Sequence, residues 1–428
     1  MAKICLVLFI LLFEFQSSAL GVEITEKQIR QYFEEVEELG VNSKNIWGIS
    51  LSGPTILVEP NTRHAYTNYS DSKNTFVKSG SFYSGILPKH LNIANTTINY
   101  AGIDWSMVML PLSNNKSERV NLIAHESFHR IQSTLGFEMS NPSNAHLDEN
   151  DARIYLRLEL EALKKALLAT KEKDIHNYLT HAFSFREYRQ NKYPKLSKGE
   201  NLLELNEGLA EYTGLIASGR DQPGMTKHLI SSINHFIMNP SYVRSFAYVT
   251  IPVYGYLLSS KDSQWNRRVN AETNLTKLFA KHFSIKVINE SIDNLGLGYG
   301  LKEIQQEEKA RSQKIAGTRF LYLRQFVLSP HLELPLAQMN ISFDLTNLFV
   351  LKEFGTVYPT MRVTDRWGIL TVENGGLMSE DWSKIILSLP TKLTDNKLIG
   401  DGWQLEINPG YQLEVDKKSN QHRIIKIE

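Results

Sequence analysis

Two histidines four residues apart, with a glutamate directly after the first, lie in the stretch NLIAHESFHRIQ of residues 121–132. On a helix, positions i and i+4 face the same side, so His125 and His129 can direct two imidazoles at one ion. Glu126 lies about 100° further round the helix, where it can serve as a general base beside that ion. The spacing therefore predicts the core of a catalytic zinc site.

A third ligand is needed, because a catalytic zinc ion is held by three protein side chains. The pattern H-E-x-x-H-x-x-G-x-x-H is excluded, since Gln132 and Leu135 stand where it requires glycine and histidine. Residues 201–218 (NLLELNEGLAEYTGLIAS) form a second helical pattern, with Glu207 and Glu211 one turn apart. One carboxylate can bind the metal while the other accepts the free N–H of a ligating histidine. A solvated helix face is the ordinary alternative for such a pair.

The motifs HESFH and LNEGLAEY together resemble the gluzincin metallopeptidases, in which a helix with H-E-x-x-H is followed by a helix that donates a glutamate. LNEG-x-A-x-Y is closest to the aminopeptidase-N-like branch. The resemblance implies Zn²⁺ bound by His125, His129 and Glu207, with Glu126 as the general base. Glu211 matches the carboxylate that orients a ligating histidine in the thermolysin-like branch. The resemblance covers these short motifs and not the rest of the chain.

The distance between the two motifs departs from the family pattern. In the best-known branches the third ligand follows much sooner than the 78 positions that separate His129 from Glu207. Most of residues 130–206 would then be an insertion, mainly a helical hairpin at about 130–200. We prefer Glu207 because of its Asn-Glu-Gly context. Carboxylates inside the insertion are rival third ligands: Asp148, Glu149 and Glu159.

The resemblance also implies a later tyrosine that stabilises the oxyanion, in a Tyr-x-x-Gly setting. In FAYVTIPVYGYLL, residues 246–258, Tyr248 fits best, although Ile251 stands where the family has glycine. Tyr254 is the fallback, and a core tyrosine with a satisfied hydroxyl is the ordinary alternative for both. No counterpart of the Gly-x-Met-Glu-Asn motif of the aminopeptidases is present. The choice between exopeptidase and endopeptidase therefore stays open.

A strand just before the first motif is the candidate for substrate binding. Residues 105–110 lie in DWSMVMLPL, and in the resembling fold an edge strand at this place binds the substrate backbone by strand addition. We expect that role here, with an ordinary core strand as the alternative.

The elements that must position these residues are those of an α+β protein. Helical periodicity is expected at 26–39, 151–171, 174–188 and 201–218, and short β-rich runs cover 47–112 and the region after 335. We expect a β-rich N-terminal lobe at 22–116, a helical zinc-site lobe at 117–334 and a small all-β domain at 335–428. For the all-β domain at 335–428 we expect a role in docking or in substrate restriction.

The first residues, MAKICLVLFILLFEFQSSALG, predict a signal peptide over 1–21. Lys3 gives the basic start, residues 4–13 are apolar, and small residues end the segment. Cys5, the only cysteine, would leave with it, so disulfides would not support the mature chain. We expect a secreted or periplasmic protein with no stable membrane anchor after cleavage.

The composition is that of a globular protein with a buried core, and the net charge narrows the classes of partner. Of the 428 residues, 42% are hydrophobic and 22% charged, while a formal net charge of +1 offers no field to attract nucleic acid. The sequence predicts an exported zinc-dependent peptidase acting on peptides or proteins. A non-catalytic exported protein that uses a peptidase-like site to hold a metal or ligand is the alternative.

Overall fold

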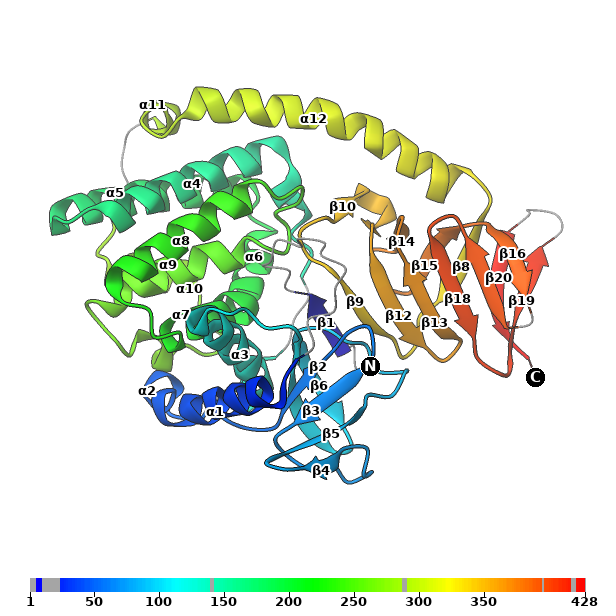
Figure 1. The fold of residues 1–428 in the computed structure, drawn as a ribbon. Coiled ribbons are helices and arrows are strands. Elements are labelled where there is room, and N and C mark those ends of the chain that lie inside the picture. The colour runs from blue at the N-terminus through cyan, green and yellow to red at the C-terminus, as the bar shows by residue number, and fades with distance from the viewer. Residues whose placement is uncertain are drawn as a thin grey trace. The chain divides into compact units, whose positions relative to one another are not determined.

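The chain forms two compact units, and the computed structural model in Figure 1 is described one unit at a time. The residues whose structure is described are 5–9, 24–138, 142–286, 291–394, 396–416 and 421–427. The larger unit comprises Gln16–Ile86 and Thr96–Lys309, and the smaller comprises Met1–Phe15, Leu87–Asn95 and Ala310–Glu428. The mixed α+β class expected from the sequence is confirmed. The expected signal peptide lies outside the described residues except for the strand β1 (Cys5–Phe9).

The larger unit contains a six-stranded sheet in the order β4-β5-β3-β2-β7-β6. Its strands are β2 (Thr55–Val58), β3 (His64–Thr67), β4 (Val77–Ser79), β5 (Phe82–Ile86), β6 (Thr96–Tyr100) and β7 (Ile103–Met109). Strand β7 pairs in parallel with β2 and antiparallel with β6. The expectation of an edge strand at 105–110 is therefore wrong, because both sides of β7 are hydrogen-bonded to neighbours and its side chains from Trp105 to Val108 are buried. The edge strands of the sheet are β4 and β6, and β6 is the one next to β7.

Helix α3 (Lys116–Ile131) carries the HESFH motif and packs against β7. It begins after Asn115, whose side chain accepts a hydrogen bond from the Ser117 N–H at 2.9 Å. Most of the helix is buried, including an apolar stripe of Val120, Ala124, Phe128 and Ile131. This stripe fixes the rotation of the helix, so that the histidines lie on the side that faces α7 (Leu209–Ala217).

The long segment between the motifs contains a helical hairpin. A 3₁₀ turn, η1 (Ala145–Asp148), leads into α4 (Asn150–Leu168), which packs along α5 (Glu172–Lys192). The two helices expected at 151–171 and 174–188 are thus present, and α5 is longer than expected by a turn at its C-terminal end.

The segment that carries LNEGLAEY is helical, as expected, but it is not one regular α-helix. It comprises α6 (Ser197–Leu203), a π-helical turn η2 (Glu204–Gly208) and α7. The Leu209 N–H donates to the Glu204 carbonyl oxygen, five residues back, which places one extra residue in the turn. Hydrophobic periodicity alone does not reveal such an insertion.

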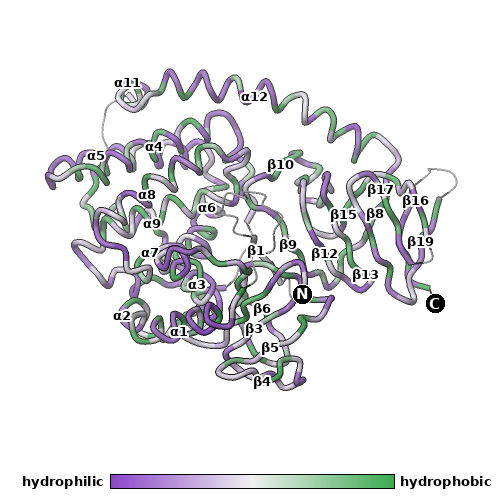
Figure 2. The backbone as a smooth tube through the Cα atoms, in the orientation of Figure 1, coloured by the Kyte–Doolittle hydropathy of each residue, from purple (hydrophilic) through white to green (hydrophobic). Residues whose placement is uncertain are grey.

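The remaining helices of the larger unit complete the core around α3 and α7. They are α1 (Glu26–Asn42), α2 (Lys44–Trp47), α8 (Gln222–Ile237), α9 (Ala247–Ser259), η3 (Trp265–Arg268), α10 (Leu275–His282) and α11 (Ile292–Leu297). Helix α1 starts with a capping box between Thr25 and Gln28. Helix α12 (Leu301–Leu323) begins in this unit, and Figure 2 shows it largely hydrophilic, in keeping with few buried positions. Within the described residues, no helix combines the length and apolar character needed to cross a membrane.

The smaller unit is built mainly of strands. Its elements are η4 (Arg324–Leu328), β8 (His331–Pro335), β9 (Asn340–Asp344), β10 (Phe349–Val350), η5 (Lys352–Phe354), β11 (Thr356–Tyr358), β12 (Met361–Asp365), β13 (Gly368–Val372), β14 (Gly376–Met378), β15 (Lys384–Ser388), β16 (Pro390–Thr394), β17 (Lys397–Gly400), β18 (Trp403–Ile407), β19 (Tyr411–Asp416) and β20 (Gln421–Lys426). They form two seven-stranded sheets, β1-β9-β12-β13-β18-β17-β16 and β10-β11-β14-β15-β8-β20-β19. A core cluster packs between η4 and the second sheet: Phe326, Leu351, Val357, Leu377 and Ile386.

Candidate metal centre

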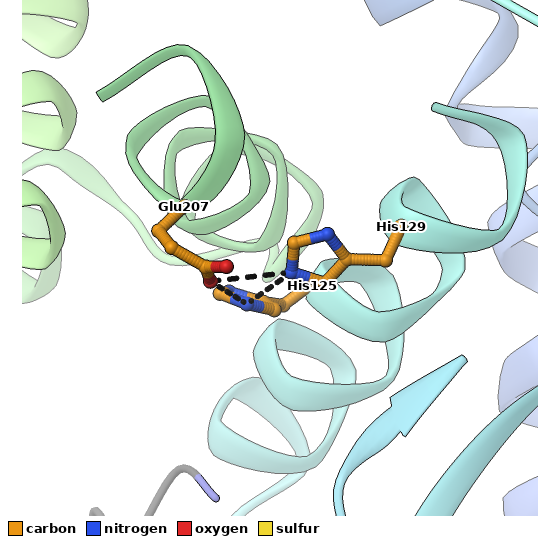
Figure 3. A group of neighbouring side chains, drawn as sticks. All are labelled: His125, His129 and Glu207. Carbon is orange, nitrogen blue, oxygen red and sulfur yellow. Dashed lines mark hydrogen bonds and ion pairs between the residues drawn. The ribbon is translucent and has the colours of Figure 1, made fainter. Parts of the chain in front are cut away.

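Three side chains from two helical segments converge inside the larger unit. His125 and His129 project from one face of α3, and Glu207 projects toward them from η2 (Figure 3). Their side chains are almost fully buried, at 1%, 7% and 1% relative exposure. The two sequence motifs, 78 positions apart, are thus brought together in space.

The spacing of the three ligand atoms fits a tetrahedral ion. The two Nε2 atoms are 3.2 Å apart, and Glu207 Oε2 lies 3.6 Å from Nε2 of His125 and 3.3 Å from Nε2 of His129. Tetrahedral zinc with metal–ligand bonds of about 2.0–2.2 Å separates neighbouring ligand atoms by roughly 3.3–3.5 Å. This buried group could therefore hold a metal ion.

Hydrogen bonds on the far side of each imidazole fix which nitrogen carries the proton. Nδ1 of His125 lies 2.9 Å from Oε2 of Glu211, and Nδ1 of His129 lies 2.9 Å from Oε1 of Gln132. Because both partners are acceptors, the proton of each neutral ring belongs on Nδ1 and the lone pair on Nε2. Three lone pairs, including that of Glu207, then converge on one point, which favours a cation there.

Glu211 occupies the orienting position that the sequence predicted for it. Its second oxygen accepts a hydrogen bond from Nδ2 of Asn121 at 3.0 Å, and Arg220 donates to Oδ1 of Asn121 at 3.0 Å. Helices α3 and α7 can approach this closely because of Gly214, where a Cβ atom would lie 2.4 Å from the Asn121 carbonyl oxygen. The carboxylate is therefore fixed from two sides before it meets His125.

A second chain of hydrogen bonds connects the two ligand motifs directly. Gln132 donates from Nε2 to Oδ1 of Asn206 at 2.6 Å, and Nδ2 of Asn206 donates to Oε1 of Glu207 at 2.9 Å. The sequence reasoning assigned no role to Gln132 or Asn206. The signal was present, because Gln132 stands three positions after His129 on the same helix face and Asn206 belongs to the Asn-Glu-Gly motif.

The rival third ligands are engaged elsewhere. Asp148 accepts a hydrogen bond from the Tyr242 N–H at 2.8 Å, and Glu149 accepts one from a tyrosine of the insertion at 3.2 Å. Glu159 is buried against two arginines of α5. Of the carboxylates that the sequence offered as third ligand, the one brought to the two histidines is Glu207.

Glu126 is buried beside the ligands, with 1% relative exposure. Within the described structure its Oε1 has no hydrogen-bond partner, and burial raises the pKa of this carboxyl to about 7. Its backbone carbonyl oxygen accepts from Oγ1 of Thr97 on β6 and from Oγ of Ser106 on β7, both at 3.3 Å. Within the described structure, Oε1 of Glu126 is therefore available to accept a proton.

Tyr248, on α9, lies beside Glu207 and His125. Its hydroxyl donates to Oε2 of Glu207 at 2.5 Å, and its ring is parallel to that of His125, with 3° between the planes and 5.6 Å between centroids. Burial and the Glu207 charge raise its pKa well above the usual value, so the hydroxyl keeps its proton. Tyr254, the fallback, instead donates to Oε1 of Glu159 at 2.9 Å.

Ile251, which stands where the resembling family has glycine on the tyrosine helix, faces a glycine on the neighbouring segment. Ile251 packs against Gly208, and a Cβ atom on that glycine would lie 2.7 Å from two carbon atoms of Ile251. The glycine of Asn-Glu-Gly thus provides the close approach of α9 to η2. That approach brings the Tyr248 hydroxyl within reach of Glu207.

Glu207 itself is kept ionised. Burial acts to raise the pKa of its carboxyl, but in the metal-free protein the positive charge of protonated His129 and His125 and their hydrogen bonds outweigh burial, and the pKa is lowered well below the usual range. An ionised, buried carboxylate facing two imidazole nitrogens is a donor set that suits a divalent metal ion.

Comparisons with protein-family models, with curated proteins and with solved structures find no match to this chain.

Proposed function

We propose that the protein is an exported zinc-dependent peptidase of gluzincin type, which hydrolyses peptide bonds. The observation that carries this proposal is the convergence of three lone pairs, on His125, His129 and Glu207, at separations that suit one tetrahedral ion. We propose peptide bonds as the substrate because the two motifs resemble those of that family of peptidases. Export rests on the signal-like pattern at 1–21.

The residues around the centre have distinct tasks in this proposal. His125, His129 and Glu207 hold zinc and leave a fourth position open, and the bound ion supplies the Lewis acidity that activates water and polarises a carbonyl. Glu126 accepts the proton of the attacking water and returns it to the leaving amine.

Tyr248 is the donor for the oxyanion. Its protonated hydroxyl reaches Oε2 of Glu207, so it lies at the edge of the ligand set, where a substrate carbonyl oxygen would gain charge.

We place the substrate backbone along β6, since β7 is paired on both sides. Strand β6 pairs with β7 through register partners such as Ile98 and Trp105, and no other strand among the described residues pairs with it. Thr97 of β6 donates to the Glu126 backbone, so this edge runs beside the base. An extended peptide added here would present its carbonyl groups to the centre.

The test uses the mature chain, its zinc stoichiometry and a mixed peptide library. We expect one zinc per chain and cleavage of peptides from the library. Glu126→Gln should abolish the cleavage without loss of zinc. Glu207→Ala should release the metal, whereas the control Glu149→Ala should retain it. Zinc binding with cleavage absent or unaffected by Glu126→Gln would refute the peptidase and leave a metal-binding protein, and a chain that binds no zinc would refute both.

A further inference from the structure

A group of buried charges joins the inserted hairpin to the helix that carries Glu207. We call it the arginine cluster, and it consists of Arg186 and Arg189 from α5, Glu159 from α4, Glu200 from α6 and Glu204 from η2. Each of these side chains has 0% relative exposure. Five buried ionic groups at one place, outside the metal ligands, require a reason.

Within the cluster the two arginines share one carboxylate and each binds a second. Nε of Arg186 lies 2.9 Å from Glu159 and Nη1 of Arg189 lies 2.6 Å from the other oxygen of Glu159. Arg186 forms a two-pronged contact with Glu204, and Arg189 one with Glu200 at 3.1 and 3.4 Å. The hairpin thus binds the ligand-carrying segment at two points one helical turn apart.

The cluster also reaches the helix that carries Tyr248. Oγ1 of Thr250 donates to Oε1 of Glu204 at 2.8 Å, and Tyr254 donates to Glu159. Glu204 therefore receives donors from α5 and α9 at once, while its own backbone carbonyl closes the π-helical turn through the Leu209 N–H. That turn contains Glu207.

The contact between Arg186 and Glu204 matters for the metal centre because Glu204 begins the π-helical turn that contains Glu207. An extra residue in a helix rotates everything beyond it by about 100° relative to a regular α-helix. The carboxylate of Glu207 meets the histidines only if the extra residue stays between positions 204 and 209. A planar guanidinium that grips Glu204 with two nitrogens fixes the first residue of that turn in position and angle.

We propose that Arg186 is a positioning residue for the metal centre, which acts from the inserted hairpin through Glu204 to hold the π-helical turn that presents Glu207. The hairpin is then a structural part of the metal site and not an appendage. This inference rests on the proposed function only in taking zinc as the ion that the site binds.

The test measures zinc affinity in variants of the full mature chain, by competition with a chromophoric chelator. Glu204→Gln keeps the size of the side chain and removes the charge that Arg186 grips, and Arg186→Lys keeps a charge but removes the two-pronged contact. The matched control is Glu308→Gln. It removes the charge of a carboxylate with 2% exposure that pairs with Arg153 at 2.8 Å and Arg157 at 3.0 Å, both on α4 of the same hairpin.

We expect Glu204→Gln and Arg186→Lys to weaken zinc binding by about tenfold to a hundredfold, the range found when groups that orient ligands are removed. Glu308→Gln should lower the melting temperature but leave the zinc affinity within twofold of the original chain. Equal affinities in Glu204→Gln and the original chain would overturn the proposal, as would an equal loss of affinity in Glu308→Gln.

Two further measurements test the role of Arg186 even if Glu204→Gln does not fold. Thr250→Val removes one hydrogen bond to Glu204 without removing a buried charge, so it should fold even if Glu204→Gln does not, and a several-fold loss of zinc affinity is expected. A crystal structure of the metal-free Arg186→Lys chain should show Glu207 displaced from the 3.3 Å separation from His129. An unmoved carboxylate would refute the positioning role even if the original chain proved to bind no zinc, the result that separately refutes the proposed function.

Discussion

Replacing Glu126 by glutamine should stabilise the metal-free protein, and by more at pH 8 than at pH 5. Burial raises the pKa of this carboxyl from 4.5 to about 7. The protonated form therefore contributes stability that is complete below pH 4.5 and is lost as the pH rises through 7. At pH 8 the buried charge costs about 3 kcal/mol, from 1.36 kcal/mol per pKa unit, and at pH 5 it costs less than about 1 kcal/mol. Glutamine carries no charge at either pH.

Calorimetry of both chains in excess chelator measures this effect. The gain in melting temperature from Glu126→Gln should be larger at pH 8 than at pH 5 by about 3–5 °C, since a difference of roughly 2–3 kcal/mol acts on a large unit, in which 1 kcal/mol shifts the melting temperature by somewhat less than about 2 °C. The exposed Glu34 on α1 supplies the control, and Glu34→Gln should shift the melting temperature by the same small amount at both pH values. A gain from Glu126→Gln that is the same at pH 5 and pH 8 would show that the buried carboxyl does not titrate in this range.

Three further predictions concern the metal centre. Gln132→Leu removes the acceptor for Nδ1 of His129, and titration with a competing chelator should show zinc affinity reduced by about tenfold to a hundredfold. Tyr248→Phe should lower kcat in peptide hydrolysis by about a hundredfold while zinc content stays at one per chain, and an unchanged kcat would remove the tyrosine from the mechanism. Withdrawal of zinc should destabilise the protein by about 2.7 kcal/mol relative to a solution with free zinc at a hundred times its dissociation constant, and a melting temperature independent of zinc would contradict a site of this kind.

The histidine pair of the candidate metal centre could be predicted from the sequence because its geometry is local. His125 and His129 are related by one helical turn, so their convergence follows from helix geometry alone. Glu207 was reached through the Asn-Glu-Gly context, and it lies where that context indicated. The orienting role of Glu211 followed from the same reasoning, and the 2.9 Å contact with His125 supports it.

Features that depend on contacts between distant segments could not be predicted in the same way. The pairing of β7 on both sides depends on β2, whose residues stand 51 positions before their partners in β7, and no pattern within 105–110 reports it. Glu204, the first residue of the π-helical turn, accepts hydrogen bonds from groups of both α5 and α9, and no local pattern reports these contacts. Tyr248 fitted a catalytic tyrosine best by sequence, with Tyr254 as the fallback, and the packing of α9 places the Tyr248 hydroxyl on Glu207 and the Tyr254 hydroxyl on Glu159.

The inserted hairpin also affects the order in which the chain can fold. A metal ion held by His129 and Glu207 would cross-link positions separated by 78 residues, and closing so long a flexible loop carries a substantial entropic cost. Helices α4 and α5 are neighbours in sequence, so they can pair early through local contacts and shorten the loop that remains. The hairpin would therefore form before the third ligand arrives, and the chain would bind its ion late in folding.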